Sequence, residues 1–110
     1  MLTSEIVKAH ALDSGADIVG IASMDRFSEL PVQFNPQSIF PDAKSMIVLG
    51  FRLFRGVFRG VQEGTFYTAY NLMGYAGTKW VFQPIALWKF VRLIENDGYE
   101  AIPIPDNFPW

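Results

Sequence analysis

The sequence predicts an α/β fold, with an α+β arrangement as the alternative, in which helices pack on a small, mostly parallel sheet of three strands. Short apolar runs of strand length, each bounded by turn residues, lie at residues 17–22, 45–50 and 99–104. Helical patterns lie at residues 4–14 and 65–96. A chain of 110 residues has single-domain length, so we expect one domain over residues 1–110.

The first helix is expected over residues 4–14. Thr3 or Ser4 can accept hydrogen bonds from its free N–H groups, and Gly15 supplies the C-terminal stop. We interpret His10, the only histidine, as a half-buried helix residue rather than a ligand or a base. The apolar stripe of this helix comprises Leu2, Ile6, Ala9 and Leu12.

Prolines punctuate the connection between the first two strands. One or two helical turns are expected over residues 24–30, because Asp25 lies near a favourable start and Pro31 prevents much continuation. Asn35 followed by Pro36 is a second helix-start signal. Interleaved apolar residues should hold this connection on the core: Phe27, Leu30, Phe34, Ile39 and Phe40.

The second strand, residues 45–50, contains four consecutive large apolar residues between a turn signal and Gly50. Such a run is typical of a strand buried on both faces at the centre of a sheet. A helical return to the third strand then implies a right-handed crossover between parallel strands. Pro103 and Pro105 place that third strand at a sheet edge, because proline cannot donate to an inner ladder.

Residues 65–96 are helical in pattern but interrupted. Gly74 and Gly77 should loosen the first part, and Pro84 should kink the helix or restart it. The second part ends in the stop signal Asn96-Asp97-Gly98 and is apolar nearly all round, which is typical of a helix buried on several sides. Three strands cannot cover so much surface. We therefore expect a partner layer, either a second copy in a homo-oligomer or a missing further domain.

Composition narrows the function classes. The charged fraction, 18%, lies below the roughly 25% of an average domain and indicates surface that meets a partner. The sequence contains no cysteine, which excludes an iron–sulfur cluster or thiolate metal site within it, and one histidine alone makes no metal centre. No apolar run approaches the roughly 18 residues of a membrane span, and the N-terminus lacks a signal-peptide pattern. We expect a cytoplasmic protein with no membrane partner.

Charge is unevenly distributed along the chain. Residues 51–92 contain six basic residues against Glu63 alone, a net charge of +5, whereas the remainder has three basic and ten acidic residues, a net charge of −7. The basic segment opens with a Phe-Arg repeat that carries Arg52, Arg55 and Arg59. Three interpretations stay open: a solvated loop, an anion site for a cofactor phosphate, or nucleic-acid binding by stacking and phosphate contact.

Aromatic residues gather in the first part of the helical stretch. Tyr67, Tyr70 and Tyr75, with Trp80 beyond them, recur at nearly helical spacing. Such residues either line a pocket for a ring-shaped ligand or belong to the core, and the pattern alone does not decide between the two.

Two parts of the chain carry a family resemblance. The first comprises Gly15-Ala16-Asp17, Val19-Gly20-Ile21-Ala22 and the run from Pro41 to Gly50. The second is Glu95-Asn96-Asp97-Gly98-Tyr99-Glu100-Ala101, which precedes an apolar run. Together they resemble the N-terminal part of epoxyqueuosine reductases and of the related cobalamin-dependent reductive dehalogenases and iron–sulfur proteins.

The resemblance implies an oxidoreductase segment that helps to wrap a corrinoid (cobalamin) cofactor. It implies a separate ferredoxin-like part with two iron–sulfur clusters and, for the epoxyqueuosine enzymes, a tRNA substrate. By position it makes Tyr67, Tyr70, Asn71 and Tyr75 candidates for cofactor binding, beside the possible phosphate ligands Arg52 and Arg55. Asp106 keeps the Asp-x-x-Pro spacing of the family's suggested proton donor, although Pro105 replaces the apolar residue before it.

The chain departs from this family because it has no cluster-binding cysteine. We therefore expect a cofactor-binding module that is inactive alone, as a fragment, a truncated product or a relative without the redox half. The alternative is a non-catalytic, homo-oligomeric ligand-binding or interaction domain that associates through the apolar helix at residues 84–96. A third hypothesis is RNA binding through Arg52, Arg55 and Arg59.

Overall fold

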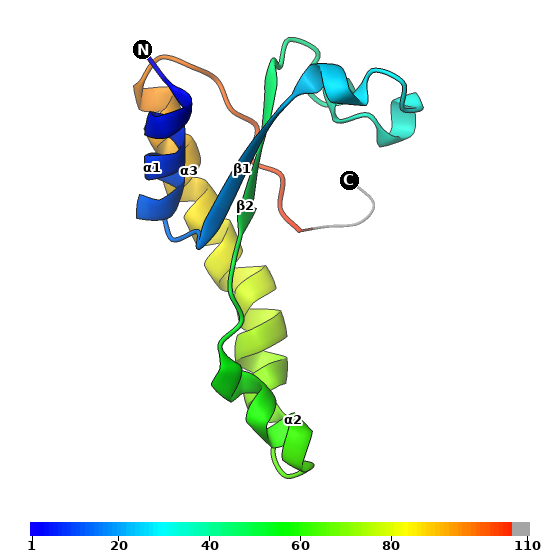
Figure 1. Cartoon of the computed structure of the whole chain (residues 1–110), viewed down its shortest axis with the longest axis vertical. Coiled ribbons are helices and arrows are strands. Elements are labelled where there is room, and N and C mark those ends of the chain that lie inside the picture. Colours follow the sequence, from blue (N-terminus) through cyan, green and yellow to red (C-terminus); the bar gives the residue numbers. More distant parts are fainter. Residues whose placement is uncertain (107–110) are drawn as a thin grey trace.

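The computed structural model of the protein describes residues 1–106 (Figure 1). Its helices and strands are α1 (Ser4–Asp13), β1 (Ile18–Ser23), β2 (Ser45–Gly50), α2 (Arg59–Glu63) and α3 (Gln83–Asn96). In Figure 1 the strands, α1 and α3 form an upper region, and a helical extension with α2 beside it projects below. We call residues 51–82 the arm and the other described residues the head.

The sheet has two antiparallel strands, β1 and β2, which pair from Ile18 with Gly50 to Ser23 with Ser45. The prediction of a mostly parallel, three-stranded sheet is therefore wrong. Between the strands lie only short 3₁₀ turns, at Met24–Phe27, Val32–Phe34 and Pro36–Ser38. Because the prolines allow no long crossover helix there, the chain turns back and pairs with the strand it has just left.

Residues 99–104 form no strand, although they were predicted to be the third one. Pro103 lacks the N–H group that a ladder requires, and Pro105 follows immediately. The main hydrogen bond of this segment, from the N–H of Ala101 to Oε2 of Glu95, is long at 3.5 Å. The predicted crossover from β2 to a parallel third strand is thus absent from the described residues.

Several local predictions are confirmed. The Thr3 hydroxyl caps α1 by accepting the Ile6 N–H at 3.2 Å, and Gly15 ends the helix with φ of +119°. The Asn35 side chain caps the turn at Pro36–Ser38 by accepting the Gln37 N–H at 2.9 Å. These signals need only neighbouring residues, which is why the sequence reveals them.

The helical stretch is continuous where an interruption was predicted. Two π-helical segments, Ala69–Ala76 and Thr78–Phe82, lead directly into α3. A Cβ on Gly77 would collide with the carbonyl oxygen of Leu72, and the Thr78 hydroxyl donates to the Met73 carbonyl at 2.8 Å. The glycine therefore widens the helix instead of breaking it. Pro84 lies where the π-helical segment passes into α3, and the helix continues through it.

The core lies in the head, between the sheet and the antiparallel pair α1 and α3. Its buried side chains are Val7, Ala11, Ala16, Phe90 and Ile94. The inner face of the sheet adds partly buried apolar residues: Val19, Ile21, Ile47 and Leu49. On the other face, Ile18 is 71% exposed and Val48 is 57% exposed. The prediction that β2 is buried on both faces is wrong, because helices cover only one face within the described residues.

The apolar helix α3 is buried along one face only. Ala86, Phe90 and Ile94 point into the core, whereas Trp88 is 67% exposed. The molecule measures 49 × 32 × 18 Å with a radius of gyration of 16.3 Å, against about 13 Å for a compact chain of this length. Its accessible area, 8068 Å², exceeds the roughly 6,100 Å² expected for a compact monomer of this mass. Much apolar surface thus faces solvent.

Candidate ligand-binding face

Three of the predicted cofactor-binding residues recur every four residues along the arm and are exposed. Tyr67 and Tyr75 are each 54% exposed, and Asn71 between them is also exposed. The Asn71 N–H donates to the Tyr67 carbonyl at 3.0 Å, which places Tyr67 one turn before Asn71. Tyr67 precedes the π-helical segment Ala69–Ala76, and Asn71 and Tyr75 lie within it at successive spacings of four. We call Tyr67, Asn71, Tyr75 and the next residue in this series, Lys79, the ring face.

Lys79 adds a positive charge to the ring face. Its Nζ lies 5.6 Å from the ring centroid of Tyr75 and 5.1 Å from that of Trp80. Both distances are within the range of a cation–π interaction. The ring face therefore offers aromatic surfaces, an amide and an amine. Lys79 was not predicted from the sequence, although its spacing of four from Tyr75 could have identified it.

Tyr70 is half-buried, unlike Tyr67, Asn71 and Tyr75. Its ring packs on Phe58, with centroids 5.5 Å apart and planes tilted by 41°. The neighbouring Gly74 is buried, and a Cβ there would lie 3.4 Å from a methyl of Val57. Tyr70 and Gly74 thus hold the turn Arg55–Phe58 against the helix. The cofactor-binding role predicted for Tyr70 gains no support from this position.

The three arginines of the repeat are all exposed but have different surroundings. The Arg52 guanidinium carbon lies 4.9 Å above the Phe54 ring, and the Arg52 backbone N–H donates to Oδ2 of Asp17 at 2.7 Å. Arg59 lies 3.6 Å from Glu63 in an i,i+4 ion pair. Arg55 has no ion-pair partner in residues 1–106. The geometry does not gather these arginines around one anion.

Arg52 lies at a pocket where the arm joins the head. This pocket has a volume of about 310 Å³, and its lining is mostly apolar. Its walls include Asp17, Phe51, Phe54, Met73, Thr78 and Phe82. The nearby Asp17 carboxylate disfavours an anion at this position. The pocket therefore does not supply the phosphate site considered from the sequence.

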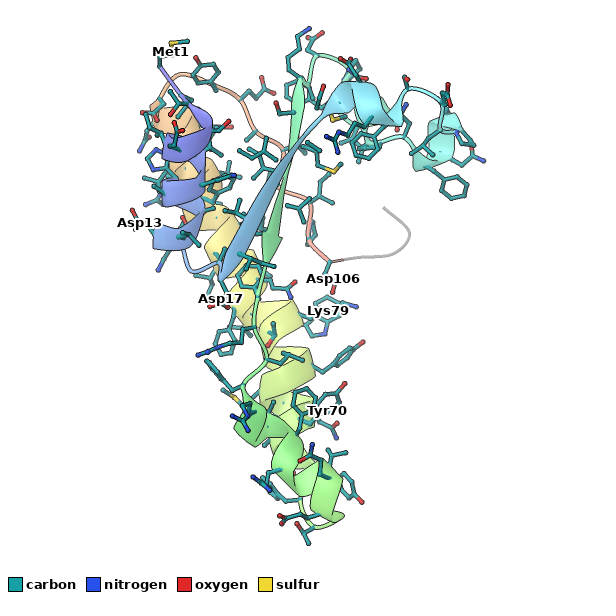
Figure 2. The ribbon with its side chains drawn as sticks, viewed as in Figure 1. Met1, Asp13, Asp17, Tyr70, Lys79 and Asp106 are labelled. Atoms are coloured by element: carbon teal, nitrogen blue, oxygen red, sulfur yellow. The ribbon has the colours of Figure 1, made fainter. Side chains whose placement is uncertain are left out.

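Asp106, the predicted proton donor, is exposed and is the last residue described. Figure 2 shows Asp106 and Tyr70 at different heights along the long axis of the molecule. Pro109, which completes the Asp-x-x-Pro spacing, lies outside the described residues. A general acid needs reach to its substrate. The role of Asp106 stays a prediction.

A larger groove in the head was missed by the sequence analysis. It has a volume of about 610 Å³ and lies between β2, α3 and the extended residues 99–104. Its walls are predominantly apolar and include Met24, Ile47, Leu87, Val91 and Ile102. The groove was not expected from the sequence, because residues 99–104 were predicted to be a third strand beside β2, which would have filled this space.

A metal-binding cluster and a membrane-spanning helix are both absent from residues 1–106. No group of three or more histidine, aspartate or glutamate side chains is placed to hold a metal ion there. Within the same residues, no helix combines the length and the apolar character that crossing a membrane requires.

Comparison of the chain with protein-family models, with curated proteins and with solved structures found no match. The resemblance to the epoxyqueuosine reductase family therefore stays a prediction.

Proposed function

We propose that this chain is a non-catalytic module that binds a corrinoid ring on the ring face of its arm. The observation that carries the proposal is the exposure of Tyr67, Asn71 and Tyr75, which recur every four residues at and within the π-helical segment. The family resemblance favours a corrinoid among planar ring ligands. As part of the same proposal, the module acts in the cytoplasm.

The chemistry of the ring face suits such a ligand. Exposed aromatic rings offer apolar surface for stacking against a large planar ring at little cost in side-chain entropy. A corrinoid carries amide groups around its ring, and the Asn71 amide and the tyrosine hydroxyls can exchange hydrogen bonds with them. Lys79 can donate to the carbonyl oxygens of these amides.

The proposed module is inactive alone. A corrinoid reductase needs a source of electrons, which in the resembled family is a pair of iron–sulfur clusters held by cysteines. This sequence has none. Electrons would have to come from another polypeptide or domain, with which the module would associate.

The test is a titration of the purified chain with hydroxocobalamin, followed by the visible spectrum and by retention of cofactor through size-exclusion chromatography. We expect a spectral shift and co-elution. Replacement of Tyr67 or Tyr75 by alanine should weaken binding about 5-fold to 10-fold each, because each removes a stacking contact worth about 1 kcal/mol.

The matched control is Tyr99→Ala, which removes a tyrosine of similar exposure in the head. It should leave the affinity unchanged. If the wild-type chain neither shifts the spectrum nor retains the cofactor, the proposal is wrong. Equal weakening by Tyr67→Ala and Tyr99→Ala would show that the ligand binds elsewhere.

A further inference from the structure

We propose that two copies of this chain pair antiparallel, so that the arm of each copy lies along the head of the other. In this arrangement, the exposed apolar surface of each copy is covered by the other copy. This inference rests on the shape, charge and exposed area of the chain and does not depend on the ring-binding proposal.

Opposite charges are separated along the molecule. The arm carries four basic residues against Glu63, a net charge of +3, and the rest of the chain carries five basic and ten acidic residues, a net charge of −5. In Figure 1 the arm and the head occupy opposite ends of the long axis. An antiparallel pair brings each arm beside the oppositely charged head, whereas a parallel pair would bring like charges together.

An exposed apolar stripe marks the centre of the proposed interface. Val81, Ile85 and Trp88 recur at spacings of four and three and are 46%, 49% and 67% exposed. The segment that contains them, coloured yellow in Figure 1, lies near the middle of the long axis. In a two-fold dimer, residues close to the axis contact their own counterparts, so a central stripe is suited to this symmetry.

Trp88 is the strongest candidate for an anchor in this stripe. Its ring lies under the Arg92 guanidinium, with 5.7 Å between the guanidinium carbon and the ring centroid. Tryptophan and arginine are the residue types most often found at energetic centres of protein interfaces. Substituting Trp88 should therefore weaken the dimer more than substituting a residue at the rim of the interface.

The exposed area is sufficient for a stable dimer. A specific interface buries about 800 Å² on each partner. The accessible area of this chain, 8068 Å², exceeds the compact-monomer expectation by roughly 1,900 Å². An interface of standard size would therefore use less than half of this excess area.

The first experiment measures the mass of the full chain by light scattering coupled to size-exclusion chromatography. At low salt we expect twice the 12.4 kDa of one chain. Raising the salt concentration to about 0.5 M, which shortens the range of charge interactions to a few ångströms, should weaken the dimer at least 10-fold. A monomer at micromolar concentration in low salt would overturn the proposal.

Charge variants test the contact between arm and head. Arg55→Glu, in the arm, should weaken the dimer about 10-fold, because Arg55 has no ion-pair partner in its own chain within residues 1–106. The matched control is Lys8→Glu, an identical change of charge at an exposed position of the head. It should leave the dimer as strong as before or strengthen it. Equal weakening by both variants would contradict the arrangement.

The relative orientation of the two copies is tested by cross-linking between introduced cysteines. Because the sequence has no cysteine of its own, each cross-link can be assigned to the introduced position. Gln62→Cys lies in the arm and Asn96→Cys lies at the far end of α3, and both positions are exposed. A short bis-maleimide should cross-link a mixture of the two variants and leave each variant alone largely uncross-linked. Cross-linking of each variant with itself, at the expense of the mixed product, would show a parallel dimer and overturn the inference.

Discussion

The head and the arm are held together in different ways, although one continuous helical stretch runs through both. The head has a small core in which Phe90 and Ile94 pack on α1 and on the inner face of the sheet. In the arm, Gly74 is the only buried residue, and the aromatic contacts of the arm are one tilted pair of rings and cations above rings. The head therefore has a small core of its own, whereas the arm buries little of its apolar surface against itself.

This contrast also relates to function. Aromatic side chains that are fully packed serve stability, and those that remain exposed are available for binding. The proposed ring face lies in the arm, and the proposed dimer stripe runs from Val81 in the arm onto the exposed side of α3 at Ile85 and Trp88. Changes at the buried positions of the head should therefore affect unfolding most, and changes at the exposed residues of the ring face and the stripe should mainly affect binding.

The largest expected effect is that of Phe90→Ala. Phe90 is 5% exposed, and removal of a buried phenylalanine ring costs about 3–5 kcal/mol of unfolding free energy. Small domains have only about 5–15 kcal/mol in total, so the variant should lose most of its cooperative transition in urea. The control, Phe66→Ala, removes a ring of the arm that is 56% exposed and should change the unfolding free energy by less than about 0.5 kcal/mol. Similar losses in both variants would mean that head and arm share one core.

A smaller effect is expected from Gly77→Ala, which tests how the arm is built. In an ordinary α-helix this change stabilises by about 1 kcal/mol. Here the new Cβ would collide with the Leu72 carbonyl, so we expect a loss of about 1–3 kcal/mol and faster amide exchange in the arm.

Gly20→Ala, in β1, provides the comparison, because a Cβ there meets nothing within 4 Å. Its effect should stay within about 0.5 kcal/mol. A gain in stability from Gly77→Ala would contradict the π-helical geometry of the arm.

The smallest effect should come from His10→Ala. The Nε2 of His10 lies 3.2 Å from Oδ2 of Asp97 and links α1 to the end of α3, but Asp97 is substantially exposed. Exposed ion pairs contribute at most about 1 kcal/mol, so the urea midpoint should fall only slightly. Arg59→Ala, which removes the Arg59–Glu63 pair of the arm, should cost about 0.3–0.5 kcal/mol. A loss of several kcal/mol for His10→Ala would show that this contact is part of the core.

The local elements of the fold were accessible from the sequence because their signals lie within a few residues. The Thr3 cap, the Asn35-Pro36 start and the stop at Gly98, which has φ of +93°, each depend on the chemistry of one turn. His10 was also predicted to be half-buried, and its side chain is 24% exposed. The apolar stripe predicted for α1 was wrong, because Ile6 and Leu12 are exposed and Val7 and Ala11 face the core.

The candidate site was only partly accessible. Spacing identified Tyr67, Asn71 and Tyr75, but the same spacing included Tyr70, which packs inward on Phe58. Which tyrosine faces solvent depends on the width of the helical turn and on the position of residues 55–58. Neither quantity is encoded in the local pattern. The grouping of arginines along the sequence likewise did not produce a grouping in space.

The sequence by itself determined where α1, β1, β2 and α3 form, because backbone propensity, capping and apolar period act over short distances. It also determined the separation of charge along the chain and the absence of cysteine chemistry. Only the tertiary structure decided that β1 and β2 run antiparallel, that residues 99–104 remain unpaired, and that one side of α3 faces solvent. The physical reason is that strand direction and burial depend on which distant surfaces meet, and an apolar run has the same sequence pattern whether or not another layer covers it.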